Sequence, residues 1–258
     1  MEISNKSFLK ACRDMVSSKT VSAAWNNYKE VLTFIGFDRH IFLSTHYRTY
    51  GLWGDPRDTL VLSSHEKKYN NALFSTELNF LKHHPDFEWL VNNPGDYMPW
   101  HQFSQDDVSN NSFKKKLKIL NDQFKVRSGI KFSLKQSNHE STCVVLLTGC
   151  KQYDQTHIDN IWATNSTKIY SISKILQLTI RSLPYTGGGI GPKHQRLTKR
   201  QAEVLTLISS GNTVIQVAQK LNLAVTTIDK HLKLARSGLS VNSTAQAVAK
   251  AEREKMLR

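Results

Sequence analysis

Near the C-terminus, a short polar segment carries hydroxyl, carboxylate, ammonium and guanidinium groups at spacings of three and four residues. In a helix, these spacings place the side chains on one outer face. Ammonium and guanidinium groups pair with phosphates, and hydroxyl, carboxylate and ammonium groups also hydrogen-bond to base edges. We therefore predict contacts to double-stranded DNA from Thr226, Thr227, Asp229, Lys230, Lys233 and Arg236, with Lys199 and Arg200 on nearby phosphates.

No comparable set of residues points to catalysis. The sequence shows no nucleophile–base pair, phosphate-cradling loop or carboxylate dyad. The glycines of residues 187–191 do not form a dinucleotide motif, because no strand leads into them and no helix starts on the last one. His83 and His84 lack the carboxylate or cysteine spacing of a metal site. We expect no enzymatic activity, no metal and no cofactor.

Three short helices are expected to position the polar segment. Thr198 with Gln201, and Thr213 with Gln216, each fit a capping box at a helix start. Gly211 suits the end of the first helix, since glycine accepts a left-handed backbone. The apolar residues at helical spacing are Val204, Leu205, Ile208, Val217, Leu221, Ile228 and Leu232. This pattern predicts a helix-turn-helix with its polar face outward.

An ordered series of short segments resembles one family of such domains. The segments are Leu197–Leu205, Gly211–Thr213, Val217–Ala218, Thr227–Leu232 and Ala247–Ala251. They are similar to the C-terminal DNA-binding domain of LuxR-type transcription factors. The resemblance implies a homodimer that binds a partly palindromic promoter operator. Its third helix would enter the major groove, with Thr227, Lys230 and Lys233 nearest the base edges.

Departures from the family pattern bear on the operator sequence. Ala224 stands where the family usually has Ser before the third helix, so we expect that N-cap bond to be lost, at roughly 0.5–2 kcal/mol. Asp229 occupies a position that is often basic. Its carboxylate can accept from cytosine N4 but repels phosphate. Gln201 replaces the usual Glu, and Thr244 stands where Arg is common.

The charge distribution agrees with DNA binding. The chain has 35 Lys plus Arg against 21 Asp plus Glu, a net charge of +14. From Lys193 to the end there are 12 basic and 4 acidic residues, so +8 of this charge lies in the last quarter of the chain. Such asymmetry is expected when one end neutralises phosphates. The alternative is a solvated basic surface with no partner.

A glycine-rich segment separates this domain from the rest. Pro184–Pro192 holds four glycines between two prolines, which is typical of a flexible tether. We predict a sensor or dimerisation domain over 1–183, a linker over 184–195 and the DNA-binding domain over 196–258. The three cysteines lack disulfide or metal spacing, and no apolar stretch approaches the ~20 residues of a membrane helix. We expect a cytoplasmic protein.

Residues 1–183 mix helical and strand patterns without βαβ regularity, which favours an antiparallel sheet between helices. We predict an α+β protein, with an N-terminal α-β-α sandwich and a C-terminal all-α helix-turn-helix domain. The predicted helices are Phe8–Val16, Ala23–Phe34, Phe74–Leu81, Phe113–Phe124 and a long helix from Ile158 to Ile180. The predicted strands are Ile41–Tyr47, Thr59–Leu62, Gly129–Leu134 and Thr142–Thr148, with a hairpin at 137–140. We expect part of the dimer contact on the apolar face of the long helix.

Three segments of this half resemble the autoinducer-binding domain of the LuxR family: Asn79–Pro85, Met98–Trp100 and Phe124–Ile130. That family domain binds N-acyl homoserine lactones between its sheet and one helix layer. By the resemblance, Gly129 is kept and Trp100 is the pocket tryptophan. The residues expected to contact a ligand are Trp100, His84, Ser75, Tyr69 and Val145.

Two of these positions lack the family's polar groups. His84 replaces the acid that accepts the ligand amide, and Ser75 replaces a phenolic donor. A buried polar group left unpaired costs roughly 1–3 kcal/mol, so we expect weak lactone binding by a pocket that suits another ligand or is closed. Trp100 could instead be a core residue, and the lysines of 114–118 could be a second DNA-facing patch or a solvated face.

Other functional interpretations stay open. One is a ligand-independent or antagonistic LuxR-like regulator, which acts by DNA binding or by heterodimerisation. The other is an enzyme whose basic tail only holds it on nucleic acid. An acid/base or nucleophile constellation in the N-terminal cavity would favour the enzyme, and the sequence shows none.

Overall fold

The computed structural model describes residues 3–45, 59–75, 84–100, 111–135, 142–183, 197–239, 241–253 and 256–257. The chain divides into two compact units, one over the residues up to Leu183 and one over the residues from Pro192 onward. Each unit contains a hydrophobic core cluster. Among the described helices, none combines the length and the apolar character needed to span a membrane.

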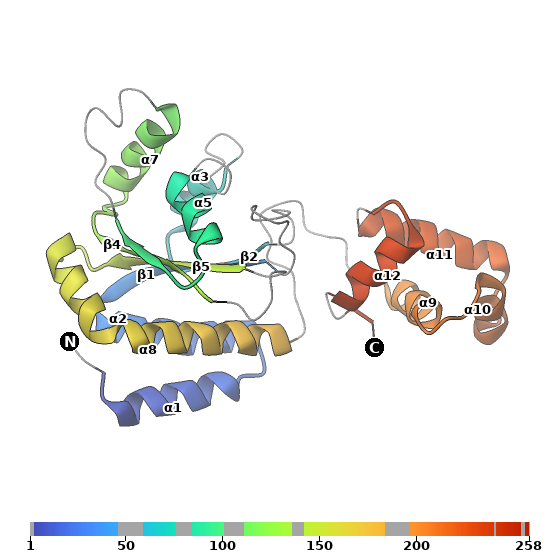
Figure 1. The fold of residues 1–258 in the computed structure, drawn as a ribbon. Helices are drawn as coiled ribbons and strands as arrows, with labels where there is room; N and C mark the ends of the chain where they lie inside the picture. Colours follow the sequence, from blue (N-terminus) through green and yellow to red (C-terminus); the bar gives the residue numbers. More distant parts are fainter. Residues whose placement is uncertain are drawn as a thin grey trace. The chain divides into compact units, whose positions relative to one another are not determined.

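The first unit is built on an antiparallel sheet, whose described strands lie in the order β2-β1-β5-β4-β3. The strands are β1 (Phe37–Thr45), β2 (Thr59–Ser63), β3 (Tyr97–Pro99), β4 (Gly129–Ser133) and β5 (Thr142–Gly149). One side of the sheet carries α1 (Asn5–Val16), α2 (Val21–Ile35) and α8 (Gln155–Ser182), and the other α3 (Lys67–Leu73), α5 (Pro85–Asn92) and α7 (Ser112–Gln123) (Figure 1). The predicted α-β-α sandwich is confirmed.

The layer of α2 and α8 covers its face of the sheet with apolar and aromatic side chains. Tyr28 of α2 hydrogen-bonds to Ser173 of α8 at 2.8 Å between the hydroxyl oxygens. The buried apolar residues of α8 are Ile158, Ile161, Trp162, Ile169, Ile172, Leu176 and Ile180. The expectation that this face of the long helix forms part of a dimer contact is therefore wrong, because the domain itself buries it.

Several boundaries differ from those predicted. Helix α3 ends at Leu73, so Phe74 and Ser75 follow a helix instead of starting one. The rest of the predicted helix Phe74–Leu81, the hairpin at 137–140 and the end of the first predicted strand lie outside the described residues. Strand β3 and helix α5 were not predicted. Strand β3 is too short to show alternation, and a proline ends it.

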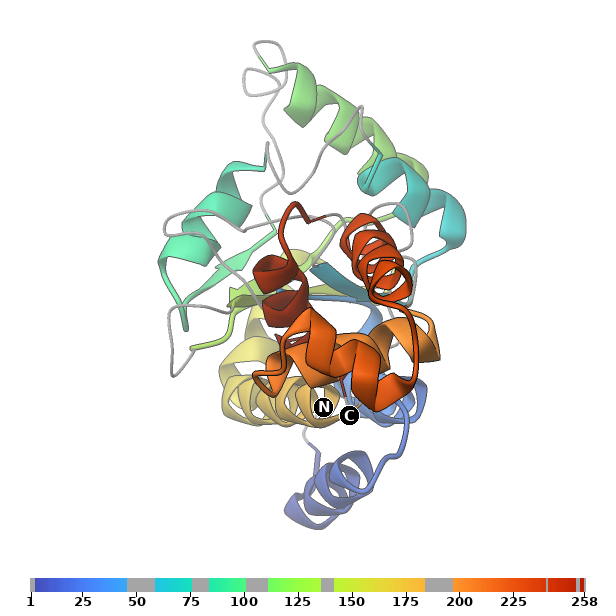
Figure 2. The same cartoon turned by 90° about the vertical axis from the view of Figure 1, so that its right-hand side faces the viewer.

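The second unit contains, in its described residues, α9 (Lys199–Ser209), α10 (Val214–Leu221), α11 (Val225–Gly238) and α12 (Thr244–Arg253). Both predicted capping boxes are present, Thr198 with Gln201 and Thr213 with Gln216. Gly211, just after α9, has a φ of +86°, as its predicted role requires. Helices α11 and α12 both pack against α9 (Figure 2). The predicted all-α domain is confirmed.

Candidate functional site

A tight turn sets α11 against α10. Asn222 adopts the left-handed backbone conformation, and the Leu223 N–H donates to the Ala218 carbonyl at 2.9 Å. Helix α11 then packs into the unit through Ile228 and Leu232, which are 0% and 4% exposed. Because two residues one helical turn apart are fixed inside, the opposite face of α11 points outward.

This outer face carries the residues predicted to contact bases. Thr226, Asp229, Lys230 and Lys233 are exposed, and Thr227 is half-buried. Their groups comprise hydroxyl donors, ammonium donors and one carboxylate acceptor, on a helix of the kind that the major groove admits. Asp229 lies one helical turn before Lys233, so acid and base share the face.

The residues expected on phosphates differ in their surroundings. Lys199, the first residue of α9, is exposed. Arg200 donates through Nη2 to the Leu221 carbonyl at the end of α10, at 3.2 Å. Arg236 donates through Nη1 to the Thr244 hydroxyl at the start of α12, at 2.9 Å. Each arginine ties two helices together, and Arg200 also pairs through Nη1 with Glu203 of α9 at 2.7 Å. A guanidinium still has further N–H donors to offer a phosphate.

In the first unit, the predicted ligand residues Tyr69 and Trp100 belong to or pack against the core cluster beneath α3, α5 and α7. The Tyr69 hydroxyl, on a side chain 1% exposed, donates to the Asn121 amide oxygen at 3.0 Å. The Trp100 indole N–H donates to the Leu147 carbonyl of β5 at 3.1 Å. The Ser75 hydroxyl donates to a backbone carbonyl of α3 at 2.8 Å. These three donors therefore have partners within the domain.

The Trp100 indole can lie where it does only because residue 129 is a glycine, which has no Cβ atom. A Cβ atom on Gly129 would lie 1.8 Å from the indole Nε1 and 2.2 Å from the Leu147 carbonyl oxygen. The indole ring therefore rests directly on the backbone of β4, where only glycine fits. The sequence pattern marked both residues, and the structure gives the contact that links them.

A buried ion pair on the same side of the sheet was not predicted. Lys131 of β4, which is 3% exposed, forms a salt bridge with Asp86 of α5. Its ammonium nitrogen lies 5.0 Å from the centroid of the Trp100 ring. Burial lowers the pKa of Lys131, and the Asp86 carboxylate opposes that shift. The sequence did contain a signal for this pair, because Lys131 interrupts an otherwise apolar strand pattern. A lysine is almost never fully buried unless it is paired, so its position could have predicted an acidic partner.

His84 lies at the start of the helix that carries Asp86. Its side chain is 2% exposed, and its ring centroid is 5.6 Å from that of Phe113 on α7. His84 is thus buried between two helices of this layer. Among the described residues, no group of three or more His, Cys, Asp or Glu side chains is placed to hold a metal ion.

Val145 lies on the opposite face of the sheet. Its cross-strand partners are Phe42 and Phe132, and Phe132 packs against Trp162 of α8. Val145 therefore does not lie on the face of the sheet that Tyr69 packs against, although both were predicted to contact the ligand. Successive residues of a strand point to opposite faces, so it is the neighbours of Val145 in β5 that join the core cluster beneath α3.

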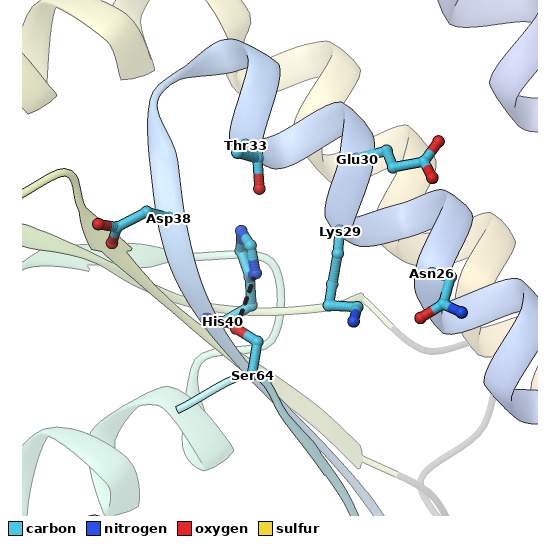
Figure 3. A pocket seen from close by; sticks show the side chains of 7 residues that line it. All are labelled: Asn26, Lys29, Glu30, Thr33, Asp38, His40 and Ser64. Atoms are coloured by element: carbon cyan, nitrogen blue, oxygen red, sulfur yellow. Dashed lines mark hydrogen bonds between the residues drawn. The ribbon is translucent and has the colours of Figure 1, made fainter. Parts of the chain in front are cut away.

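A polar pocket of about 530 Å³ lies beside α2 and the start of β1 (Figure 3). It is lined by Asn26, Lys29, Glu30, Thr33, Asp38, His40 and Ser64. The His40 Nε2 atom is 2.7 Å from the Phe37 carbonyl oxygen, and Nδ1 is 3.1 Å from the Ser64 hydroxyl. Because a carbonyl only accepts, Nε2 carries the proton. Burial lowers the pKa of His40 to about 4, so the ring is neutral near pH 7 and Nδ1 accepts from Ser64.

Comparison with known sequences bears on the second unit. Residues 195–251 match the family described as bacterial regulatory proteins, luxR family. The transcriptional regulatory protein LiaR of Bacillus subtilis (strain 168) is 31% identical over 85 residues, which are 33% of this chain and 40% of LiaR. The chain therefore spans well under two thirds of that relative's length.

Comparison with solved structures bears on the fold of the whole chain. SdiA in complex with octanoyl-rac-glycerol is similar with a TM-score of 0.51 and 14% identity, over 100% of this chain and 99% of SdiA. A crystal structure of Escherichia coli SdiA gives 0.52 and 12%, over 97% and 98%. The N-acylhomoserine lactone-dependent LuxR-family factor CepR2 of Burkholderia cenocepacia gives 0.50 and 11%, over 68% and 96%. At these identities, the likeness establishes a shared fold.

Proposed function

We propose that this chain, whose C-terminal domain belongs to the luxR family of bacterial regulatory proteins, is a cytoplasmic transcription regulator that binds a promoter operator in double-stranded DNA as a homodimer. The observation that supports DNA binding most is the outer face of α11. There Asp229, Lys230 and Lys233 are exposed on a helix held in place by the buried Ile228. The proposal includes no enzymatic step.

The exchange of Lys233 for Ala should weaken operator binding by roughly 1–3 kcal/mol and change the preferred sequence, because a base-edge contact is lost. Lys199→Ala should weaken binding to all duplexes alike and flatten the plot of log affinity against log salt by about 0.9, the loss expected for one phosphate contact. Fluorescence anisotropy on operator and random duplexes at several salt concentrations measures both effects. Identical losses on both duplexes for both variants would contradict these roles.

A homodimer is proposed from the geometry of DNA. Two half-sites on one side of a duplex need two recognition helices about 34 Å apart. Because α8 buries its apolar face within the domain, exposed apolar residues elsewhere are left for the contact. Leu9 and Val16 of α1 are 62% and 64% exposed.

We also propose that the first unit is a sensor domain for an acyl-chain ligand. Its fold is similar to that of SdiA, which was solved with octanoyl-rac-glycerol. The polar groups near Trp100 and Tyr69 already have partners within the domain, and Lys131 pairs with Asp86. A neutral lactone would have to replace such bonds without leaving a buried group unpaired, so we expect acyl-homoserine lactones to bind weakly or not at all.

Thermal unfolding with octanoyl-rac-glycerol and a panel of acyl-homoserine lactones tests this sensor proposal. A ligand at 100 times its dissociation constant stabilises by about 2.7 kcal/mol, which raises the melting temperature by several degrees. We expect no such rise in melting temperature with lactones.

Two substitutions test which missing group matters. If only the carboxylate acceptor that His84 replaces is needed, His84→Asp should produce a rise with lactones. If the phenolic donor that Ser75 replaces is needed as well, Ser75→Tyr should be required in addition. Val145→Thr, on the other face of the sheet, is the control. A clear rise for the unmodified protein with any lactone would contradict the expectation that lactones bind weakly or not at all.

A ligand-independent or antagonistic regulator is the second candidate. The internal partners of Trp100 and Tyr69, together with the Lys131–Asp86 pair, favour it, because they satisfy these polar groups without a ligand. Such a regulator would bind DNA constitutively or form inactive heterodimers. Operator binding by ligand-free protein, with no thermal shift from any acyl compound, is the outcome that this candidate predicts.

A further inference from the structure

The excess positive charge of the N-terminal part lies almost entirely on α7 and the residues that follow it. Residues 1–192 carry a net charge of +6, and residues 112–127 account for +5 of it, with six basic side chains and one acidic. The other residues of this part are nearly balanced. A general requirement for solubility would not concentrate the charge on one segment.

These basic side chains are presented on the outside of the domain. Leu117 and Leu120 are buried and hold α7 against the core. Lys115, Lys125 and Arg127 are exposed. Only Asp122 opposes this charge within the segment, and it pairs with Lys118 at 3.0 Å. We call Lys115, Lys116, Lys118, Lys125 and Arg127 the α7 basic surface.

The end of α7 is held by hydrogen bonds from strand β1 and from helix α3. The Arg39 guanidinium of β1 donates to the carbonyls of Phe124 and Lys125, at 2.8 and 3.1 Å. The Tyr69 hydroxyl donates to Asn121 of α7 at 3.0 Å. The basic side chains therefore extend from a fixed backbone, which reduces the ordering cost of binding an extended polyanion.

We propose that the α7 basic surface contacts DNA phosphates, as a second and sequence-independent contact of the regulator. The inference rests on the proposed function, because a second unit that binds DNA keeps the first near the duplex at a high effective concentration. A lipid surface fits less well. Ile119 is the large exposed apolar residue of α7, and the apolar face of the helix is buried in the domain, so little remains to enter a bilayer.

The test compares two full-length triple variants that remove the same charge. In one variant, Lys115, Lys125 and Arg127 are changed to Gln. In the other, the changes are at Lys6 and Lys10 of α1 and at Lys19 just after it, all of which are exposed. The first should weaken binding to operator and random duplexes by the same factor. It should also flatten the plot of log affinity against log salt by about 2.7, or 0.9 for each lost phosphate contact. The α1 control should leave the slope of the wild type unchanged.

Two results would overturn the proposal. Equal slopes for both triple variants would show that the α7 basic surface makes no phosphate contact. Loss of binding to vesicles of phosphatidylglycerol and phosphatidylcholine, with unchanged DNA binding, would assign the surface to a membrane instead. If the wild type shows no preference for any operator over random DNA, the proposed function itself fails. A flattened slope on random duplex would still support the α7 contact in that case.

Discussion

At the residue scale, the imidazole of His40 is a buried group whose protonation opposes folding. Its ring bridges the Phe37 carbonyl and the Ser64 hydroxyl and is 1% exposed. Burial lowers its pKa to about 4 in the folded state, from an ordinary value of 6.5. Between these two values the unfolded chain binds more protons than the folded one. The free energy of unfolding should therefore fall as the pH falls from about 6.5 to about 4.

This linkage predicts a loss of about 3 kcal/mol from His40 alone over that interval, and little further change from this residue below pH 4. Urea unfolding of the wild type and of His40→Gln, measured between pH 4 and pH 7, checks it. The variant should show a weaker pH dependence, whereas His157→Gln, at an exposed position of α8, should match the wild type. If His40→Gln keeps the full pH dependence, the assignment of the linkage to His40 is wrong.

Individual residues also show which contacts could not be predicted from the sequence. The resemblance singled out Trp100 and Gly129 separately, and only the structure shows the indole lying on the glycine. Val145 was predicted to contact the ligand together with Tyr69, yet the two lie on opposite sides of the sheet, and a shift of one residue in a strand alignment is enough to reverse the side-chain direction. The Lys131–Asp86 pair joins β4 to α5, and no local pattern reports a contact between segments so far apart in the sequence.

At the scale of elements, helix capping gave the most reliable predictions. The boxes at Thr198 and Thr213 are local, so residue types three positions apart are sufficient to identify them. Strand β3 and helix α5 were missed because they are short and depend on packing against the sheet. The long helix was predicted correctly, but its burial was not, because burial depends on α2 and the sheet.

Helix α11 begins without a side-chain cap, and this predicts a stabilising substitution. Ala224 has the extended backbone of an N-cap residue but makes no cap bond. Ala224→Ser should let a hydroxyl accept from a backbone N–H of the first turn, which raises the free energy of unfolding by about 1 kcal/mol. Thermal unfolding should show a higher melting temperature, while Ala245→Ser within α12 should give no such gain. An unchanged or lower melting temperature for Ala224→Ser would contradict the cap assignment.

At the scale of the whole molecule, the two units divide the work that we propose. The C-terminal unit carries the exposed polar face of α11 and +8 of the net charge from Lys193 onward. The N-terminal unit concentrates its excess charge on α7 and buries polar groups beneath α3 and α5. Composition and charge were sufficient to predict that the C-terminal unit binds DNA. Both are sums over many residues, so an error of one residue in an alignment does not change them.

The central claim is that the full-length chain recognises a specific operator as a dimer through α11. Selection of bound duplexes from a random library, followed by sequencing, tests it most directly. We predict one enriched sequence with two inverted half-sites, whose centres are about one helical turn of DNA apart. The same selection with Lys233→Ala should change the enriched bases within each half-site. Enrichment of no sequence, or of one that is the same for both proteins, would contradict the claim.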